Sequence, residues 1–79
     1  MMLGELLRRL RESRGLKVSD VVEALDAPRA TIYHWEGPNS RPEPESLKPL
    51  LELYEATDEE RLQVWELRGT PPDQLVEAV

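Results

Sequence analysis

The leucine spacing at the start of the chain constrains its fold more than any other feature. Four leucines recur at positions i, i+3, i+4 and i+7, namely Leu3, Leu6, Leu7 and Leu10. An α-helix carries residues at this spacing on one face. Gly15 is a candidate for the position just beyond the helix end, where a left-handed backbone favours glycine. The spacing therefore predicts an amphipathic first helix that ends near Gly15.

Four more stretches show helical spacing. The second helix is predicted over residues 18–25, and the third from Pro28 to about Glu36. Residues 37–46 contain three prolines and one glycine, which predicts a loop. Apolar residues at positions 47, 50, 51 and 54 mark the fourth helix. The fifth begins at Thr57, whose spacing from Glu60 is that of a capping box, and ends at Gly69.

The same pattern predicts which side chains are buried and where two prolines lie. The expected buried residues of the third and fifth helices are Ile32, Trp35, Leu62 and Trp65, with Val64 as a further candidate. Pro28 suits the first turn of the third helix, because its missing N–H loses no hydrogen bond there. Pro49 is compatible with the fourth helix only in the first turn.

These helices predict an all-α fold, a compact five-helix bundle in one domain over residues 1–69. Seventy-nine residues are enough for only one small domain. Residues 70–79 are expected to form a tail that is either frayed or helical for one or two turns. The absence of cysteine excludes disulfide frameworks and thiolate zinc sites.

Hydropathy predicts a protein without membrane contact. No apolar run approaches the roughly 20 residues that a membrane span needs. The first ten residues carry regularly placed charges instead of the apolar core of a signal peptide. We therefore expect a cytoplasmic protein, which DNA binding would associate with the nucleoid.

Charge is distributed unevenly along the chain. Residues 1–41 hold seven basic and six acidic side chains, and residues 42–79 hold three basic and ten acidic. The two parts carry +1 and −7, which sum to the formal net charge of −6. A phosphate-facing surface therefore remains possible in the N-terminal part.

Two short helices joined by a turn of three or four residues are typical of a helix-turn-helix, although any small bundle contains such pairs. The segment LGELLRRLRESRGLKVSDVVEALDAPRATIYHWE resembles the lambda-repressor-like, xenobiotic-response-element family of helix-turn-helix proteins. The matching features are LRRLRESRGL in the first helix, the small-to-aliphatic pattern of the second, TIYHWE in the third and the leucine pattern of the fourth. The resemblance covers roughly residues 3–67 and implies a DNA-binding domain.

The resemblance also implies roles for four residues outside the exposed start of the third helix. Arg11 and Glu36 are expected to pair across the first and third helices and so fix the third helix against the scaffold. Asp26 stands where the family usually has glycine, and Asp adopts the left-handed conformation more readily than most residues. Lys17 replaces the usual Ser or Thr cap of the second helix and adds a cation beside its start.

In such domains the exposed residues at the start of the third helix enter the major groove of DNA. Arg29 has the length and the forked donors to bind guanine O6 and N7 together, whereas the alternative is a solvated arginine at a helix start. Ala30 and the methyl group of Thr31 can contact a thymine methyl group. Tyr33 offers a hydroxyl group and His34 an imidazole donor.

The complete set of residues expected to contact DNA is Lys17, Ser19, Arg29, Ala30, Thr31, Tyr33, His34, Asn39 and Arg41. Asn39 and Arg41 are candidates for phosphate or minor-groove contact, with an ordinary surface loop as the alternative. His34 is the only histidine and no cysteine accompanies it, so no metal site is expected. No cofactor is expected either.

Two functions remain open. The first is a sequence-specific transcription regulator, expected to be a repressor, that binds double-stranded DNA. The second is a helix-turn-helix fold used for protein contacts, in which the acidic C-terminal part binds transcription machinery or another partner protein. A steep loss of DNA affinity with salt would distinguish the first from the second. An enzyme is not expected, because no catalytic constellation can be assembled from one histidine and dispersed carboxylates.

The end of the chain predicts a homodimer. The fifth helix has more apolar side chains than one side of a short helix can bury, and positions 75, 76 and 79 in the tail are also apolar. A two-fold dimer would bind two half-sites about one helical turn of DNA apart. The alternative is that Leu62 and Trp65 only close the core of a monomer.

Overall fold

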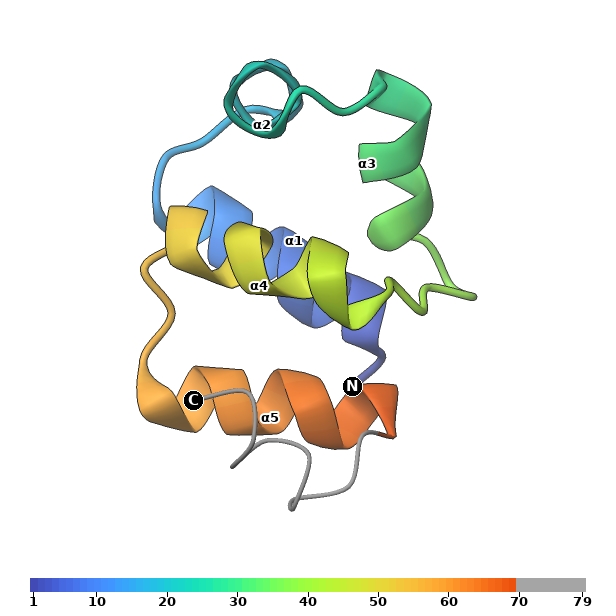
Figure 1. Ribbon diagram of the computed structural model, residues 1–79. Helices are drawn as coiled ribbons and strands as arrows, with labels where there is room; N and C mark the ends of the chain where they lie inside the picture. Colours follow the sequence, from blue (N-terminus) through green and yellow to red (C-terminus); the bar gives the residue numbers. More distant parts are fainter. Residues whose placement is uncertain (70–79) are drawn as a thin grey trace.

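The computed structural model describes residues 1–69, and these form five α-helices and no strand. The helices are α1 (Leu3–Ser13), α2 (Val18–Leu25), α3 (Arg29–Trp35), α4 (Pro44–Leu53) and α5 (Asp58–Arg68). In Figure 1, α1 and α4 lie between the α2–α3 pair on one side and α5 on the other. The all-α class and the five predicted helices are confirmed. The tail expected over residues 70–79 lies outside the described residues, and the domain boundary at residue 69 stays a prediction.

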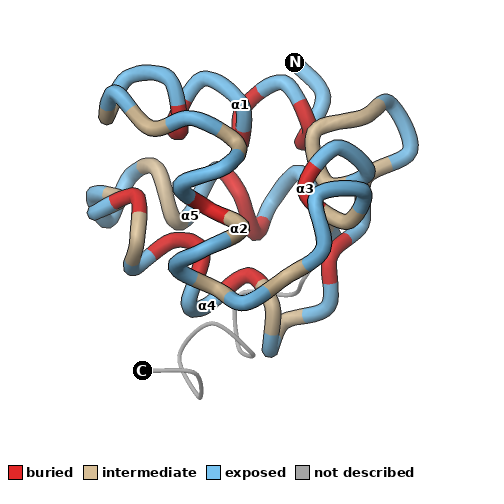
Figure 2. The backbone as a smooth tube through the Cα atoms, turned by 90° about the horizontal axis from the view of Figure 1, so that it is seen from above, coloured by how far each residue is buried: buried red, intermediate tan, exposed pale blue. Residues whose placement is uncertain are grey.

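The core lies around α1 and α4, and each of the other helices contributes to it. Figure 2 shows buried positions in all five helices, separated by exposed ones on their outer sides. The leucine stripe of α1 is buried as its spacing predicts. The apolar side chains of the core are Leu3, Leu6, Leu7, Leu10, Val21, Ile32, Leu47, Leu50, Leu51, Tyr54, Val64 and Trp65.

One prediction of burial is wrong, and a second is met only in part. Leu62 is 47% exposed, whereas Val64 and Trp65 form the buried side of α5. Leu62 lies two positions before Val64, which turns it about 200° around the helix and away from the core. Trp35 is only half-buried, while Ile32 is fully covered. The outer side of Trp35 lines a groove beside α4.

The prediction that Pro49 lies in the first turn of its helix is also wrong. The helix begins at Pro44, so Pro49 is its sixth residue. Proline is favoured at the first helical position because its missing N–H needs no partner there. Pro44 therefore extends the helix into the segment predicted as loop. As a consequence Pro49 cannot donate to the carbonyl of Glu45, four residues earlier.

The helix ends largely follow the sequence. Gly15 and Gly69 have positive φ, and Asp26 takes the left-handed conformation with φ of 51°. Pro28 precedes α3 as its N-cap instead of lying in its first turn. The side chain of Lys17 does not cap α2, but its backbone N–H donates to the Asp20 carboxylate at 2.7 Å.

Gly4 allows α1 and the end of α3 to come into backbone contact. A Cβ atom at Gly4 would lie 2.7 Å from the carbonyl oxygen of Glu36 and still closer to that of Gly37. Real Cβ atoms essentially never approach a backbone atom this closely. Glycine is therefore required at this position by the packing of two helices, although its own φ is ordinary.

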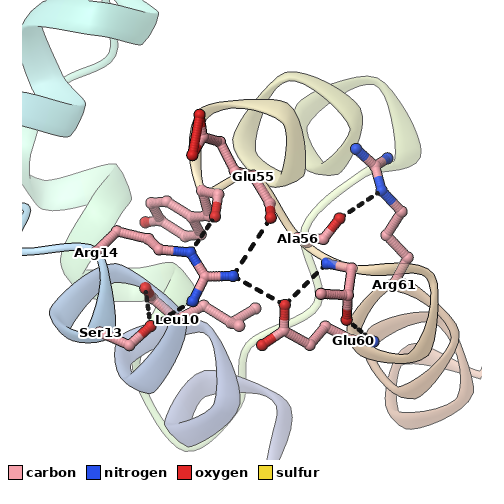
Figure 3. A network of polar contacts seen from close by, with 9 residues as sticks. Leu10, Ser13, Arg14, Glu55, Ala56, Glu60 and Arg61 are labelled. Atoms are coloured by element: carbon pink, nitrogen blue, oxygen red, sulfur yellow. Dashed lines mark hydrogen bonds and ion pairs between the residues drawn. The ribbon is translucent and has the colours of Figure 1, made fainter.

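Arg14, just after α1, binds the α4–α5 connection (Figure 3). Its guanidinium donates to the carbonyl oxygens of Tyr54 and Glu55 and to the carboxylate of Glu60 at 2.9 Å. The same carboxylate accepts the N–H of Thr57 at 2.8 Å, and the Thr57 hydroxyl accepts the N–H of Glu60. The predicted capping box is thus confirmed.

We expect Gly4→Ala to destabilise the fold. Alanine is about 0.5–1 kcal/mol better than glycine inside a helix, but here the added methyl group must displace backbone. Overpacking of this kind costs roughly 1–3 kcal/mol, so the free energy of unfolding measured in urea should fall. Glu5→Ala, on the exposed side of the same turn, is the control and should change stability little. A stability gain for Gly4→Ala would contradict the close contact.

We also expect Glu60 to contribute to stability at neutral pH. The hydrogen bond from Thr57 lowers the pKa of Glu60 below its usual value, and Arg14 acts in the same direction. A lowered pKa in the folded state stabilises the fold above the unfolded pKa, about 4.3, and this contribution is lost as the pH falls through the folded value. Glu60→Gln should therefore lower the free energy of unfolding at pH 7 and approach wild type in acid.

The control for this prediction is Glu59→Gln, which removes one carboxylate from the exposed side of the same helix turn. Urea unfolding between about pH 7 and pH 3 measures both variants. Equal curves for Glu60→Gln and Glu59→Gln would show that the Glu60 contacts do not contribute.

Candidate nucleic-acid interface

The α2–α3 pair is joined by the short turn of residues 26–28. The N–H of Ala27 donates to the carbonyl of Val22 at 3.2 Å, which closes the end of α2. Val21 of α2 and Ile32 of α3 are almost fully buried and hold the two helices to the core. α2 is viewed along its axis in Figure 1, whereas α3 runs across the view, so the helices cross steeply. This is the geometry of a helix-turn-helix.

The outer side of α3 carries four of the residues expected to contact DNA. Arg29, Ala30, Tyr33 and His34 are all exposed, Tyr33 by 56%. Ala30 and His34 are four residues apart and therefore share a face, on the side of the helix away from Ile32. The structure thus brings these four side chains onto one surface, which we name the outer α3 surface.

Thr31 is placed differently from the other four. Its side chain is half-buried and lines the groove between α3 and α4 together with Trp35 and Glu45. Thr31 therefore lies at the edge of the outer α3 surface. Sequence reasoning grouped it with its neighbours because it could not tell on which side of α3 the fourth helix packs.

The remaining four candidates lie at two separate places. Lys17 and Ser19 are exposed at the start of α2. Asn39 and Arg41 are exposed in the loop that follows α3. Arg29 opens α3, and this loop leaves the other end of the helix, which lies roughly 10 Å away along the axis.

Arg11 and Glu36 form the ion pair that the family resemblance implies. Arg11 Nε lies 2.6 Å from Glu36 Oε2, and Nη2 lies 3.0 Å from Oε1, so the contact is bidentate. Both side chains are about nine-tenths buried. Arg11 Nη1 also donates to the carbonyl of Leu16 at 2.9 Å. The hydrogen bond to Glu36 raises the pKa of Arg11, although burial opposes it.

The electrostatics of α3 differ from those of the rest of the chain. α3 contains no Asp or Glu, whereas each of the other four described helices contains at least two. The carboxylate that follows α3, on Glu36, is buried against Arg11. The outer α3 surface therefore carries an arginine and a histidine without a carboxylate from its own helix.

Sequence reasoning missed two contributors to this arrangement. Gly4 permits the contact between α1 and the end of α3, and the carbonyl of Leu16 accepts the third hydrogen bond of Arg11. The available signal for Gly4 was a glycine beside a helical leucine stripe, where a good helix former is expected. No sequence signal marks a backbone carbonyl such as that of Leu16.

Within residues 1–69, no three His, Cys, Asp or Glu side chains are gathered as metal ligands. None of the described helices has the length and hydropathy that crossing a bilayer requires.

Comparison with known proteins identifies the fold family. A family model described as a helix-turn-helix domain matches residues 2–64, which is most of the chain and includes α1 to α4 with the first part of α5. No curated protein matches the chain, and no solved structure does. The steep α2–α3 crossing and the match over most of the length agree, and the chain belongs to the helix-turn-helix domain family.

Proposed function

We propose that this chain is a sequence-specific DNA-binding transcription regulator that inserts α3 into the major groove. The observation that carries the proposal is the outer α3 surface. It presents exposed hydrogen-bond donors on α3, the only described helix that contains no Asp or Glu. Membership of the helix-turn-helix family supports the same function. Repression is the proposed outcome, because occupation of a site is sufficient to exclude another protein from it.

The outer α3 surface supplies the contacts to bases. Arg29 offers paired donors to guanine O6 and N7, which is the commonest specific contact in the major groove. Ala30 leaves space for a thymine methyl group, while Tyr33 and His34 offer polar groups that can bond to base edges or phosphates. Thr31 is the least available of the five, because it is half-buried.

Four residues supply contacts to the DNA backbone in this proposal. Lys17 and Ser19 at the start of α2 bind one phosphate region, and Asn39 and Arg41 bind another beyond the end of α3. Such contacts position a protein on DNA without distinguishing sequence. Each cation that neutralises a phosphate also adds to the salt dependence of binding.

The net charge of −6 is compatible with this function. Exposed charges act over about a Debye length, roughly 8–10 Å at ordinary ionic strength, so the local charge of the contact surface matters more than the sum. Ten of the sixteen acidic residues lie beyond residue 41, outside α2 and α3. These carboxylates weaken nonspecific attraction to DNA, and the specific contacts must therefore provide more of the affinity.

We further propose that the chain binds DNA as a homodimer through α5 and the segment after it. Leu62 and Leu67 are exposed on α5 by 47% and 39%, which leaves apolar surface for a second copy. Val64 and Trp65 belong to the monomer core instead. A two-fold dimer would present its two α3 helices to half-sites about 34–36 Å apart.

We expect Arg29→Ala to reduce discrimination at one base pair. The lost bidentate contact should cost roughly 1–3 kcal/mol on the cognate sequence and little on scrambled DNA. The cognate sequence is first selected from a random DNA pool, and affinities are then measured at several salt concentrations. The control is Arg9→Ala, which removes the same charge from an exposed position of α1 outside the proposed DNA contacts.

Arg9→Ala should bind DNA almost as wild type does. If Arg29→Ala binds both cognate and scrambled DNA at wild-type strength, Arg29 does not contact bases. If the wild-type chain selects no sequence and its affinity hardly depends on salt, the proposed function itself is wrong.

We expect the wild-type chain to be dimeric at tens of micromolar in sedimentation equilibrium. Leu62→Glu, which places a charge on an exposed position of α5, and a variant ending at Gly69 should each shift the chain toward monomer. Ser19→Glu adds the same charge at an exposed position of α2, on the other side of α1 and α4 from α5, and is the control. A monomeric wild type, or a dimer that both variants leave intact, would exclude assembly through α5.

A further inference from the structure

A groove with a volume of about 500 Å³ lies between the α2–α3 turn, α3 and the first half of α4. Of the residues proposed to contact DNA, only the half-buried Thr31 lines this groove. Its lining residues are Ala24, Leu25, Asp26, Ala27, Pro28, Thr31, Trp35, Glu45, Ser46 and Pro49.

The groove is acidic. Asp26 and Glu45 are its only charged lining residues, and no lysine or arginine lines it. Both are exposed at the surface of the groove. Neither carboxylate has a hydrogen-bond or ion-pair partner among the described residues. Two unpaired carboxylates in one groove favour a cationic ligand over a phosphate.

Pro49 strengthens this preference. Because proline has no N–H, the carbonyl of Glu45 loses the helical donor it would otherwise have, and residues four apart lie on the same side of a helix. The start of α4 offers few donors to an anion, since Pro44 has no N–H. The N–H groups of Ser46 and Leu47 both donate to the carbonyl of Glu43.

The floor of the groove is apolar and contains an aromatic ring. Trp35 and Leu25 are half-buried there, and Ala27 and Pro49 extend the apolar surface. A tryptophan face attracts cations, guanidinium groups most often. The aliphatic part of an arginine side chain can also pack against apolar surface while its charge meets the carboxylates.

We propose that this groove is the docking site for an arginine side chain of a partner protein, with the guanidinium between Asp26 and Glu45 and beside Trp35. Arginine fits better than lysine, because its planar fork serves several acceptors and stacks on an indole ring. A protein segment fits better than a free small molecule. Half of the lining residues are exposed, whereas small-molecule sites enclose most of the ligand.

The proposal does not depend on DNA binding. The groove lies on the side of α3 that faces α4, and its key residues are Asp26, Trp35 and Glu45. The outer α3 surface, with Ala30 and His34, lies on a different side of the helix. A test without DNA therefore decides this inference alone, and failure of the proposed regulator function would leave it standing.

The test uses the full chain and two capped peptides, acetyl-Leu-Arg-Leu-amide and the same peptide with citrulline, which is isosteric with arginine but uncharged. Peptides are titrated to millimolar concentration, and binding is followed by NMR on the indole N–H of Trp35 and the backbone amides of Asp26 and Ser46. We expect saturable shifts at these groups with the arginine peptide, and binding about two- to fivefold weaker with the citrulline peptide.

Two variants should weaken binding of the arginine peptide by a similar factor, about two- to fivefold. Glu45→Gln removes one carboxylate, and Asp26→Asn removes the other while asparagine still tolerates the left-handed conformation. The control is Glu52→Gln, an exposed position of α4 outside the groove, which should bind as wild type does.

Three results would overturn the proposal. If the citrulline peptide binds as tightly as the arginine peptide, the two carboxylates do not contribute to binding. Equal weakening by Glu52→Gln, or shifts spread over α4 and α5, would indicate general attraction to an acidic protein. Shifts of the groove residues with protein concentration alone would assign the groove to a second copy of the chain.

Discussion

The bidentate contact between Arg11 and Glu36 is the interaction on which the orientation of α3 depends. One guanidinium joins α1, the end of α3 and, through the carbonyl of Leu16, the connection into α2. Burying both charges costs solvation free energy, and only good geometry with additional hydrogen bonds offsets that cost. Removing either partner would strand a buried charge, so α3 is held in one orientation. The outer α3 surface is therefore preorganised before it meets any ligand.

α1 acts as the scaffold because Arg11 near its end and Arg14 just after it bind opposite parts of the fold. Arg11 faces α3, while Arg14, just beyond the helix, binds the α4–α5 connection. Tyr54 is buried between these contacts, and burial raises the pKa of its hydroxyl group, with the Glu36 carboxylate adding to the effect. Gly4 completes the scaffold at the start of α1, where a backbone contact replaces a side-chain one. Polar contacts and close backbone packing thus supplement a core that is small for its surface.

The charge pattern gives the two sides of α3 different preferences. The outer α3 surface has cationic and donor groups and no carboxylate of its own, which suits a polyanion. The groove on the α4 side has two unpaired carboxylates beside an indole ring, which suits a cation. A short helix can serve both ligands because residues one position apart, such as Ala30 and Thr31, point about 100° apart around its axis. Binding DNA and binding a basic protein segment are therefore compatible roles for one domain.

Leucine periodicity predicted α1 and the body of α4 from sequence alone, and the capping box at Thr57 predicted the start of α5, because both are local patterns. The family resemblance similarly located Arg11, Glu36 and the exposed start of α3. Tertiary structure decided which helix packs against which face, because a local pattern carries no information on distant neighbours. It placed Leu62 outside and Trp35 beside a groove, because helical spacing gives a face but not the neighbour that covers it. It also decided the need for glycine at position 4 and the place of Pro49 inside α4. The need for Gly4 depends on how closely α1 approaches the end of α3. The place of Pro49 depends on the start of α4 at Pro44.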